Sequence, residues 1–113
     1  MNEEARMSLW EAFSTLFLDT EVTDADVRYV ARVIQDSGAT LEKAEAVLWN
    51  EVFPILHPNL TSTMGEWAGW PRDWLKEKLR PTSGSARRPR YGWAATQIKQ
   101  RWKLVLAILG SGT

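Results

Sequence analysis

The chain has 113 residues, of which 44% are hydrophobic and 25% are charged, and it contains no cysteine. This composition is typical of one globular domain, and it excludes disulfides, thiolate metal sites and a cysteine nucleophile. The longest apolar run, residues 104–109, is far shorter than the roughly 20 residues of a membrane-spanning helix. The acidic N-terminus also lacks the pattern of a secretory signal. We therefore expect a cytoplasmic protein that does not cross a membrane.

Two helices are predicted over the first third of the chain. Apolar residues recur at intervals of three and four from residue 3 to residue 18, which is the spacing of one helical face. Thr23 is typical of a helix N-cap because Asp26 follows three residues later, and Gly38 is typical of the left-handed residue that ends a helix. A second helix is therefore expected between Thr23 and Gly38.

A third helix is expected directly after a short turn. Thr40 is a suitable N-cap, and inward-facing positions then recur over residues 41–52. Pro54 predicts the end of this helix or a kink, because proline lacks the amide hydrogen and clashes with the preceding turn. A proline at the start of residues 71–79 favours a short fourth helix there.

Residues 80–92, with the sequence RPTSGSARRPRYG, are rich in arginine, proline and glycine and have no apolar periodicity. We expect a flexible basic loop in this segment and a last helix over residues 93–109, with Ile98 and Val105 facing inward. No alternating strand pattern competes with the helices. The sequence thus predicts an all-α fold, a compact bundle of about five helices forming a single domain over residues 1–113.

The net charge of zero conceals a strong asymmetry along the chain. Residues 1–70 carry twelve acidic and four basic residues, a net charge of −8. Residues 71–113 carry two acidic and ten basic residues, a net charge of +8. Such an asymmetry indicates a charged docking surface for a partner. The alternative is that the two parts pack against each other and their charges largely cancel.

Seven tryptophans are many for a chain of this length, and Trp67, Trp70 and Trp74 are spaced like one face of a helix. One interpretation is that they fill the core, because each aromatic side chain buries a large area. The other is that Trp67 or Trp70, in a turn flanked by glycines, is exposed and anchors a protein interface, where tryptophan is enriched.

The acidic residues form the candidate partner-binding group. A calcium loop that began at Asp19 would need glycine at its sixth position and glutamate at its twelfth, but those positions hold Asp24 and Val30. We therefore expect no metal, and no nucleotide or other cofactor motif is present. The group is predicted to complement a basic cleft in a protein partner. Its members are Asp19, Glu21, Asp24, Asp26, Glu42, Glu45, Glu51 and Glu66, together with Trp67 and Trp70.

An alternative binding site lies in the basic loop. Arg87, Arg88, Arg90 and Tyr91 interleave cations with an aromatic ring, as in many sites for single-stranded nucleic acid. The charge of −8 on residues 1–70 would repel phosphate, and the isoelectric point near 6.6 is low for a dedicated nucleic-acid-binding protein. A nucleic-acid-associated regulator is therefore the second hypothesis.

A catalytic site is the third possibility. His57 is the only histidine, and no thiol or second imidazole is present to complete a metal site with it. No serine lies in a nucleophile elbow, so catalysis would require His57 to meet Glu51 or Glu66 in the folded chain. We expect a binding protein and not an enzyme.

Three segments resemble a family of small bacterial proteins of unknown function. They are LFLDTE at residues 16–21, NEVFP at residues 50–54, and GEWAGW at residues 65–70, which Trp74 and Leu75 follow. The resemblance covers about residues 9–79, within the acidic part formed by residues 1–79, and it leaves out the basic loop and the last helix. It implies a bacterial cytoplasmic protein and assigns no catalytic residue.

Small all-α proteins of this type are similar, by analogy, to immunity proteins encoded beside toxin genes. The leading hypothesis is therefore an immunity-type protein that binds a toxin or another enzyme and blocks its active site with the acidic, tryptophan-containing surface.

Overall fold

The computed structural model describes residues 2–17, 22–61, 70–90 and 92–111, and within them the regular structure is helical and contains no strand. The elements are α1 (Glu3–Ser14), η1 (Thr15–Phe17), α2 (Asp24–Ser37), α3 (Leu41–Ala46), η2 (Val47–Val52), α4 (Phe53–Leu56), α5 (Pro58–Thr61), α6 (Arg72–Lys78) and α7 (Trp93–Ser111). Because α3, η2 and α4 follow one another without a break and α5 is a single turn, these elements make about five principal helices. The predicted all-α bundle is confirmed.

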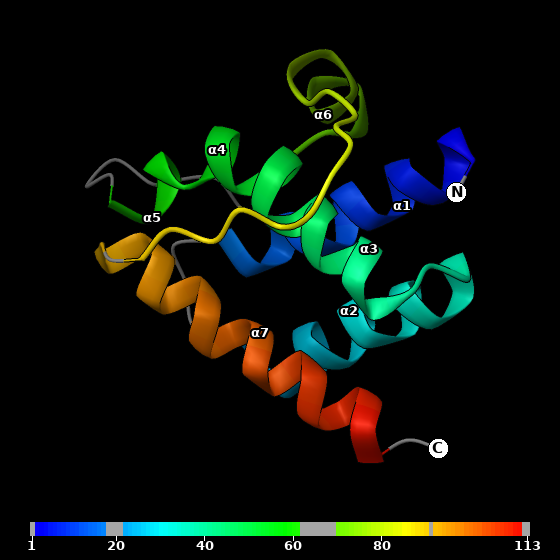
Figure 1. Ribbon diagram of the computed structural model, residues 1–113, viewed down its shortest axis with the longest axis vertical. Helices are drawn as coiled ribbons and strands as arrows, with labels where there is room; N and C mark the ends of the chain where they lie inside the picture. Colours follow the sequence, from blue (N-terminus) through cyan, green and yellow to red (C-terminus); the bar gives the residue numbers. More distant parts are fainter. Residues whose placement is uncertain (1, 18–21, 62–69, 91, 112–113) are drawn as a thin grey trace.

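The core lies where α2 packs between α1 and α7. The continuous helix formed by α3, η2 and α4 closes another side of the bundle, because η2 packs against α1. Figure 1 shows the segment after α6, in yellow, passing this continuous helix on its way to α7. Each of the long helices contributes fully buried apolar side chains, among them Phe13, Val30, Leu48 and Ile98.

The helix ends in the first half of the chain follow the predicted capping residues. The Thr23 hydroxyl accepts a hydrogen bond from the Asp26 amide, and the Asp26 carboxylate accepts one from the Thr23 amide, so both predicted residues form a capping box at α2. Gly38 ends α2 with a φ of 73°, a conformation that glycine adopts without steric cost. Thr40 caps α3 through the Lys43 amide. The predicted short turn between the second and third helices is confirmed.

Pro54 changes the type of helix and does not end it. The six residues before Phe53 form a π-helical turn, in which the Phe53 amide donates to the carbonyl of Leu48, five residues earlier. A wider turn relieves the clash that a proline ring makes with the carbonyl four residues before it in an α-helix. The additional residue also changes the direction in which Asn50 and Glu51 project from the helix.

The last helix, α7, extends two residues beyond its predicted end. It buries Ile98 and Val105 against the bundle, as its apolar spacing predicted, and Trp102 is buried with them. Arg101 on the same helix donates a hydrogen bond to the carbonyl of Leu16 in η1. Neither α7 nor any other helix in the described part of the chain is long and apolar enough to cross a membrane.

Replacing Thr23 with alanine tests the contribution of the capping box. The substitution T23A removes both hydrogen bonds of the threonine hydroxyl, and we expect it to lower the free energy of unfolding by about 1 kcal/mol. Thermal unfolding followed by circular dichroism would show this as a fall in Tm of about 4 °C. The control Q100A, at an exposed position of α7, is expected to leave Tm within about 1 °C.

Candidate functional site

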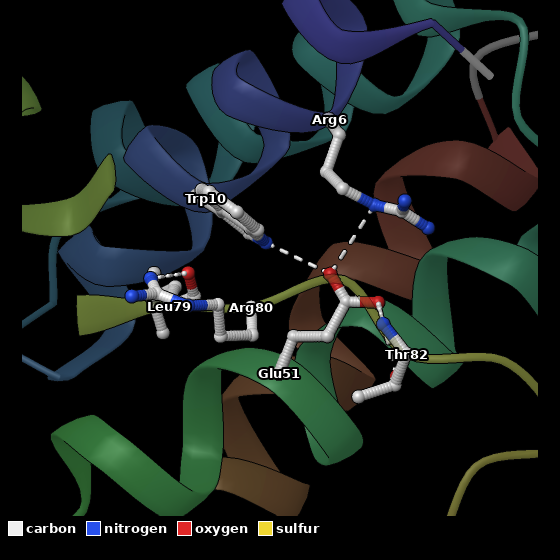
Figure 2. A network of polar contacts seen from close by, with 6 residues as sticks. All are labelled: Arg6, Trp10, Glu51, Leu79, Arg80 and Thr82. Carbon is white, nitrogen blue, oxygen red and sulfur yellow. Dashed lines mark hydrogen bonds and ion pairs between the residues drawn. The ribbon is translucent and has the colours of Figure 1, made fainter. Parts of the chain in front are cut away.

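Glu51 was predicted to lie on the acidic docking surface, but it is buried, with 3% of its surface exposed. Figure 2 shows its carboxylate between α1 and the segment that follows α6. Oε1 accepts a hydrogen bond from Trp10 Nε1 at 2.9 Å and lies 3.3 Å from Arg6 Nε. Oε2 accepts hydrogen bonds from the amide and the hydroxyl of Thr82, at 3.0 and 3.1 Å. The prediction for Glu51 is wrong, because a carboxylate inside the protein needs these partners and is not available to a ligand.

Asn50, the neighbour of Glu51, binds the backbone of residues 80–90, which we call the connecting segment. Its side-chain Nδ2 donates to the carbonyl of Ser85 at 2.9 Å, and its Oδ1 accepts from the amide of Arg87 at 2.8 Å. The hydrogen bonds to Asn50 and Glu51 place the connecting segment against the continuous helix. The flexibility expected for residues 80–92 stays a prediction.

Among the described residues, ion pairs join the acidic and basic parts of the chain at two places. In the connecting segment, Arg88 lies 3.2 Å from Glu45 of α3. Arg72 of α6 lies 2.6 Å from Glu4 and 2.9 Å from Glu11, both of α1. The hydrogen bond to Glu4 raises the pKa of Arg72. These intramolecular ion pairs neutralise part of the opposite charge. Glu45 is partly exposed, but it is paired with Arg88.

The other described members of the predicted acidic surface lie in two separate places. Asp24 and Asp26 are at the start of α2, where Asp26 is part of the capping box. Glu42 is at the start of α3, beyond the far end of α2, and a helix of 14 residues is about 21 Å long. Three further members, Asp19, Glu21 and Glu66, lie outside the described residues.

The turn between α2 and α3 presents a small exposed group, which we call the α2–α3 corner: Asp36, Leu41 and Glu42. Leu41 is 48% exposed, which is high for an apolar side chain. Neither carboxylate forms an ion pair with any described residue, although Arg32 and Lys43 are close in the sequence. Leu41 belongs to the apolar spacing that predicted the third helix, but it faces solvent at the start of α3. No sequence pattern indicated Asp36.

The tryptophans are divided between the core and the surface. Trp10, Trp49 and Trp102 are buried, in agreement with the core interpretation. Trp70, a predicted interface residue, is only partly exposed and packs near Trp74, with 6.5 Å between the ring centroids. Trp67 lies outside the described residues. The most exposed tryptophan of the described chain is Trp93, at 57%, which no sequence pattern indicated.

The three arginines that were predicted to bind nucleic acid lie near the end of the connecting segment. Arg87, Arg88 and Arg90 are all exposed, although Arg88 is paired with Glu45. Tyr91 lies outside the described residues. The Arg87 guanidinium forms no ion pair with the part of the chain that the structure describes.

Residues of the connecting segment line two hollows. The first hollow, of about 840 Å³, lies between α1 and α6 and includes Arg6, Trp10, Arg72, Lys76, Leu79 and Arg80. The second hollow, of about 580 Å³, is lined by Trp49, Asn50, Phe53, Pro54, His57, Thr82, Ser83, Arg87 and Pro89. Glu51 holds residues of both, since it binds Trp10 at the first hollow and Thr82 at the second.

His57 and Glu51 do not form the catalytic pair that the third hypothesis required. The imidazole stacks on the ring of Phe53, with centroids 5.0 Å apart and planes inclined by 21°. Both oxygens of Glu51 are bound to other residues, and Glu66 lies outside the described residues. Among the residues that the structure describes, no group of three or more His, Asp or Glu side chains is arranged to hold a metal ion.

Replacing Glu51 with glutamine tests whether this carboxylate is a structural centre. E51Q keeps the size of the side chain, but it removes the charge opposite Arg6 and replaces one of the two acceptor oxygens by an NH2 donor. The glutamine can therefore accept from Trp10 or from Thr82, but not from both. We expect the free energy of unfolding in urea to fall by about 3 kcal/mol. In the double-mutant cycle with R6M, the two losses should not add, because both variants remove the same ion pair. Additive losses, or a loss below 0.5 kcal/mol, would contradict the assignment.

Comparisons with known proteins place the chain in a family. The chain shows no match to curated proteins or to solved structures. A family model described as a domain of unknown function, DUF7079, matches residues 4–108, which extend from the first turn of α1 into the last turns of α7 and include the connecting segment and all residues that line the second hollow. The match thus extends through the basic loop and last helix, which the sequence resemblance left out. The chain belongs to this family, the domain of unknown function DUF7079.

Proposed function

We propose that this protein is an immunity-type protein of the bacterial cytoplasm, which binds a protein toxin or another enzyme and blocks its active site. The observation that carries the proposal is the α2–α3 corner, where an exposed leucine shares one turn with two exposed carboxylates that form no ion pair with a described residue. Interfaces commonly combine an apolar contact with surrounding charges of one sign, which set the orientation of the partner and the rate of association.

Because intramolecular ion pairs neutralise several glutamates, the proposed acidic surface is smaller than the one expected from the sequence. Glu4, Glu11, Glu45 and Glu51 are neutralised by Arg72, Arg88 and Arg6. Asp36 and Glu42 keep their charge, and Asp24 adds a second acidic position at the start of α2. In the proposed complex, Leu41 contacts an apolar part of the partner, and the two adjacent carboxylates face cations at its basic cleft. Trp67 and Glu66, outside the described residues, remain predicted members of the interface.

The test uses the product of the gene adjacent to the one that encodes this chain. We expect the two proteins to co-purify, and co-expression to relieve any toxicity of the neighbour. The double variant D36N/E42Q should raise the Kd about tenfold, because each exposed charge pair contributes up to about 1 kcal/mol, and the effect should shrink in 0.5 M salt. Isothermal titration at two salt concentrations measures both quantities.

The matched control is D73N/E77Q, which removes two exposed carboxylates from α6, away from the α2–α3 corner. It should leave the Kd unchanged. Equal weakening by both double variants would show that only the total charge matters and would contradict a docking site at this corner. Absence of any complex with the neighbouring gene product would contradict the immunity function itself.

A further inference from the structure

A row of aromatic rings leads from the core to the second hollow. Trp49, Phe53 and His57 follow one another at intervals of four residues. The ring centroids are 5.1 Å apart between Trp49 and Phe53, and 5.0 Å apart between Phe53 and His57. Trp49 and Phe53 are buried, whereas His57 is partly exposed. The row therefore ends in a flat ring that is fixed in orientation and accessible at the hollow.

The polar groups of the second hollow that remain available are hydrogen-bond donors. No aspartate or glutamate lines it. The amide of Asn50 is already engaged by the connecting segment, which leaves the Arg87 guanidinium, the Ser83 hydroxyl and the His57 ring. Trp49 also has a buried indole nitrogen without a hydrogen-bond partner in the described chain, as Trp102 does in the core.

The charges around the second hollow favour an anion. The nearest carboxylates are neutralised, since Glu45 is paired with Arg88 and Glu51 with Arg6. Arg90 is exposed one residue after Pro89, whose carbonyl accepts a hydrogen bond from Lys99 Nζ at 2.6 Å. Lys99 therefore adds its positive charge close to the hollow. Arg87, Arg90 and Lys99 form no ion pair with a described carboxylate.

We propose that the second hollow binds a nucleotide, either free or as one unit of a single strand. The base stacks on the ring of His57, and the phosphate accepts hydrogen bonds from the guanidinium of Arg87. Aromatic side chains stack on bases of any sequence, and the guanidinium fork matches the oxygens of a phosphate. A volume of about 580 Å³ lies within the range of small-molecule sites in proteins. This site is separate from the α2–α3 corner and does not depend on the immunity function.

The single histidine makes the proposal directly measurable by NMR. The full chain, labelled with ¹³C at histidine, would be titrated with adenosine monophosphate, with a single-stranded oligonucleotide and with inorganic phosphate. We expect both nucleotide probes to shift the His57 ring signals and phosphate alone to shift them much less. Saturation by adenosine monophosphate identifies a free nucleotide as the ligand. A response to the oligonucleotide only identifies a strand.

Two substitutions distinguish nucleotide binding at this site from nonspecific attraction of anions to a positively charged surface. R87A keeps the backbone amide that binds Asn50, so the chain should fold normally, and it should weaken nucleotide binding about tenfold. K103A removes one exposed positive charge elsewhere, on α7, and should leave binding unchanged. No change in the His57 signals with millimolar nucleotide or oligonucleotide, or equal weakening by R87A and K103A, would overturn the proposal.

Discussion

A buried carboxylate connects three parts of this chain that are far apart in the sequence. Removing a charge from water costs several kcal/mol, and Glu51 recovers this only by binding a cation, an indole and a backbone amide together. Its partners Trp10 and Thr82 are 41 and 31 residues away along the chain. If any one of these partners moves away, the Glu51 carboxylate loses a partner inside the protein. The positions of α1, the π-helical turn and the connecting segment therefore depend on one another.

This arrangement explains why both hollows have defined shapes. The side chain of Trp10 that lines the first hollow is oriented by its hydrogen bond to Glu51. Thr82, which lines the second hollow, is held through its amide and its hydroxyl. Asn50 then fixes the next part of the connecting segment and with it the backbone of Arg87. Asn50 and Glu51, two adjacent residues of the π-helical turn, thus position residues that line both hollows. Such turns are frequent at functional sites.

Local patterns in the sequence predicted the helices and their ends, because capping residues and apolar spacing act over a few residues. Thr23, Gly38 and Thr40 stand at helix ends as expected. The burial of Glu51 also had a local signal, since it follows Leu48 by three residues and so lies on the inward face of the helix. Its partners had none, because no spacing in the sequence relates residue 51 to residues 10 and 82. For the same reason, no sequence pattern indicated that the connecting segment binds Asn50 and Glu51.

The charge asymmetry of the sequence is resolved in part within the fold. Arg72 and Arg88, from the basic part of the chain, form ion pairs with carboxylates of the acidic part. The charges that these pairs leave include the carboxylates of the α2–α3 corner and the cations around the second hollow. The Glu45–Arg88 pair bridges α3 and the connecting segment, so the acidic and basic surfaces belong to neighbouring elements.

Amide hydrogen exchange of the connecting segment, measured residue by residue by NMR, tests the central role of Glu51 and Asn50 most directly. The amides of Thr82 and Arg87 donate to these two side chains, whereas no described acceptor binds the amides of Ser83 and Gly84. We expect Thr82 and Arg87 to exchange at least about a hundredfold more slowly than their neighbours, as hydrogen-bonded amides do when opening is rare. Uniformly fast exchange over residues 82–87 would contradict the account.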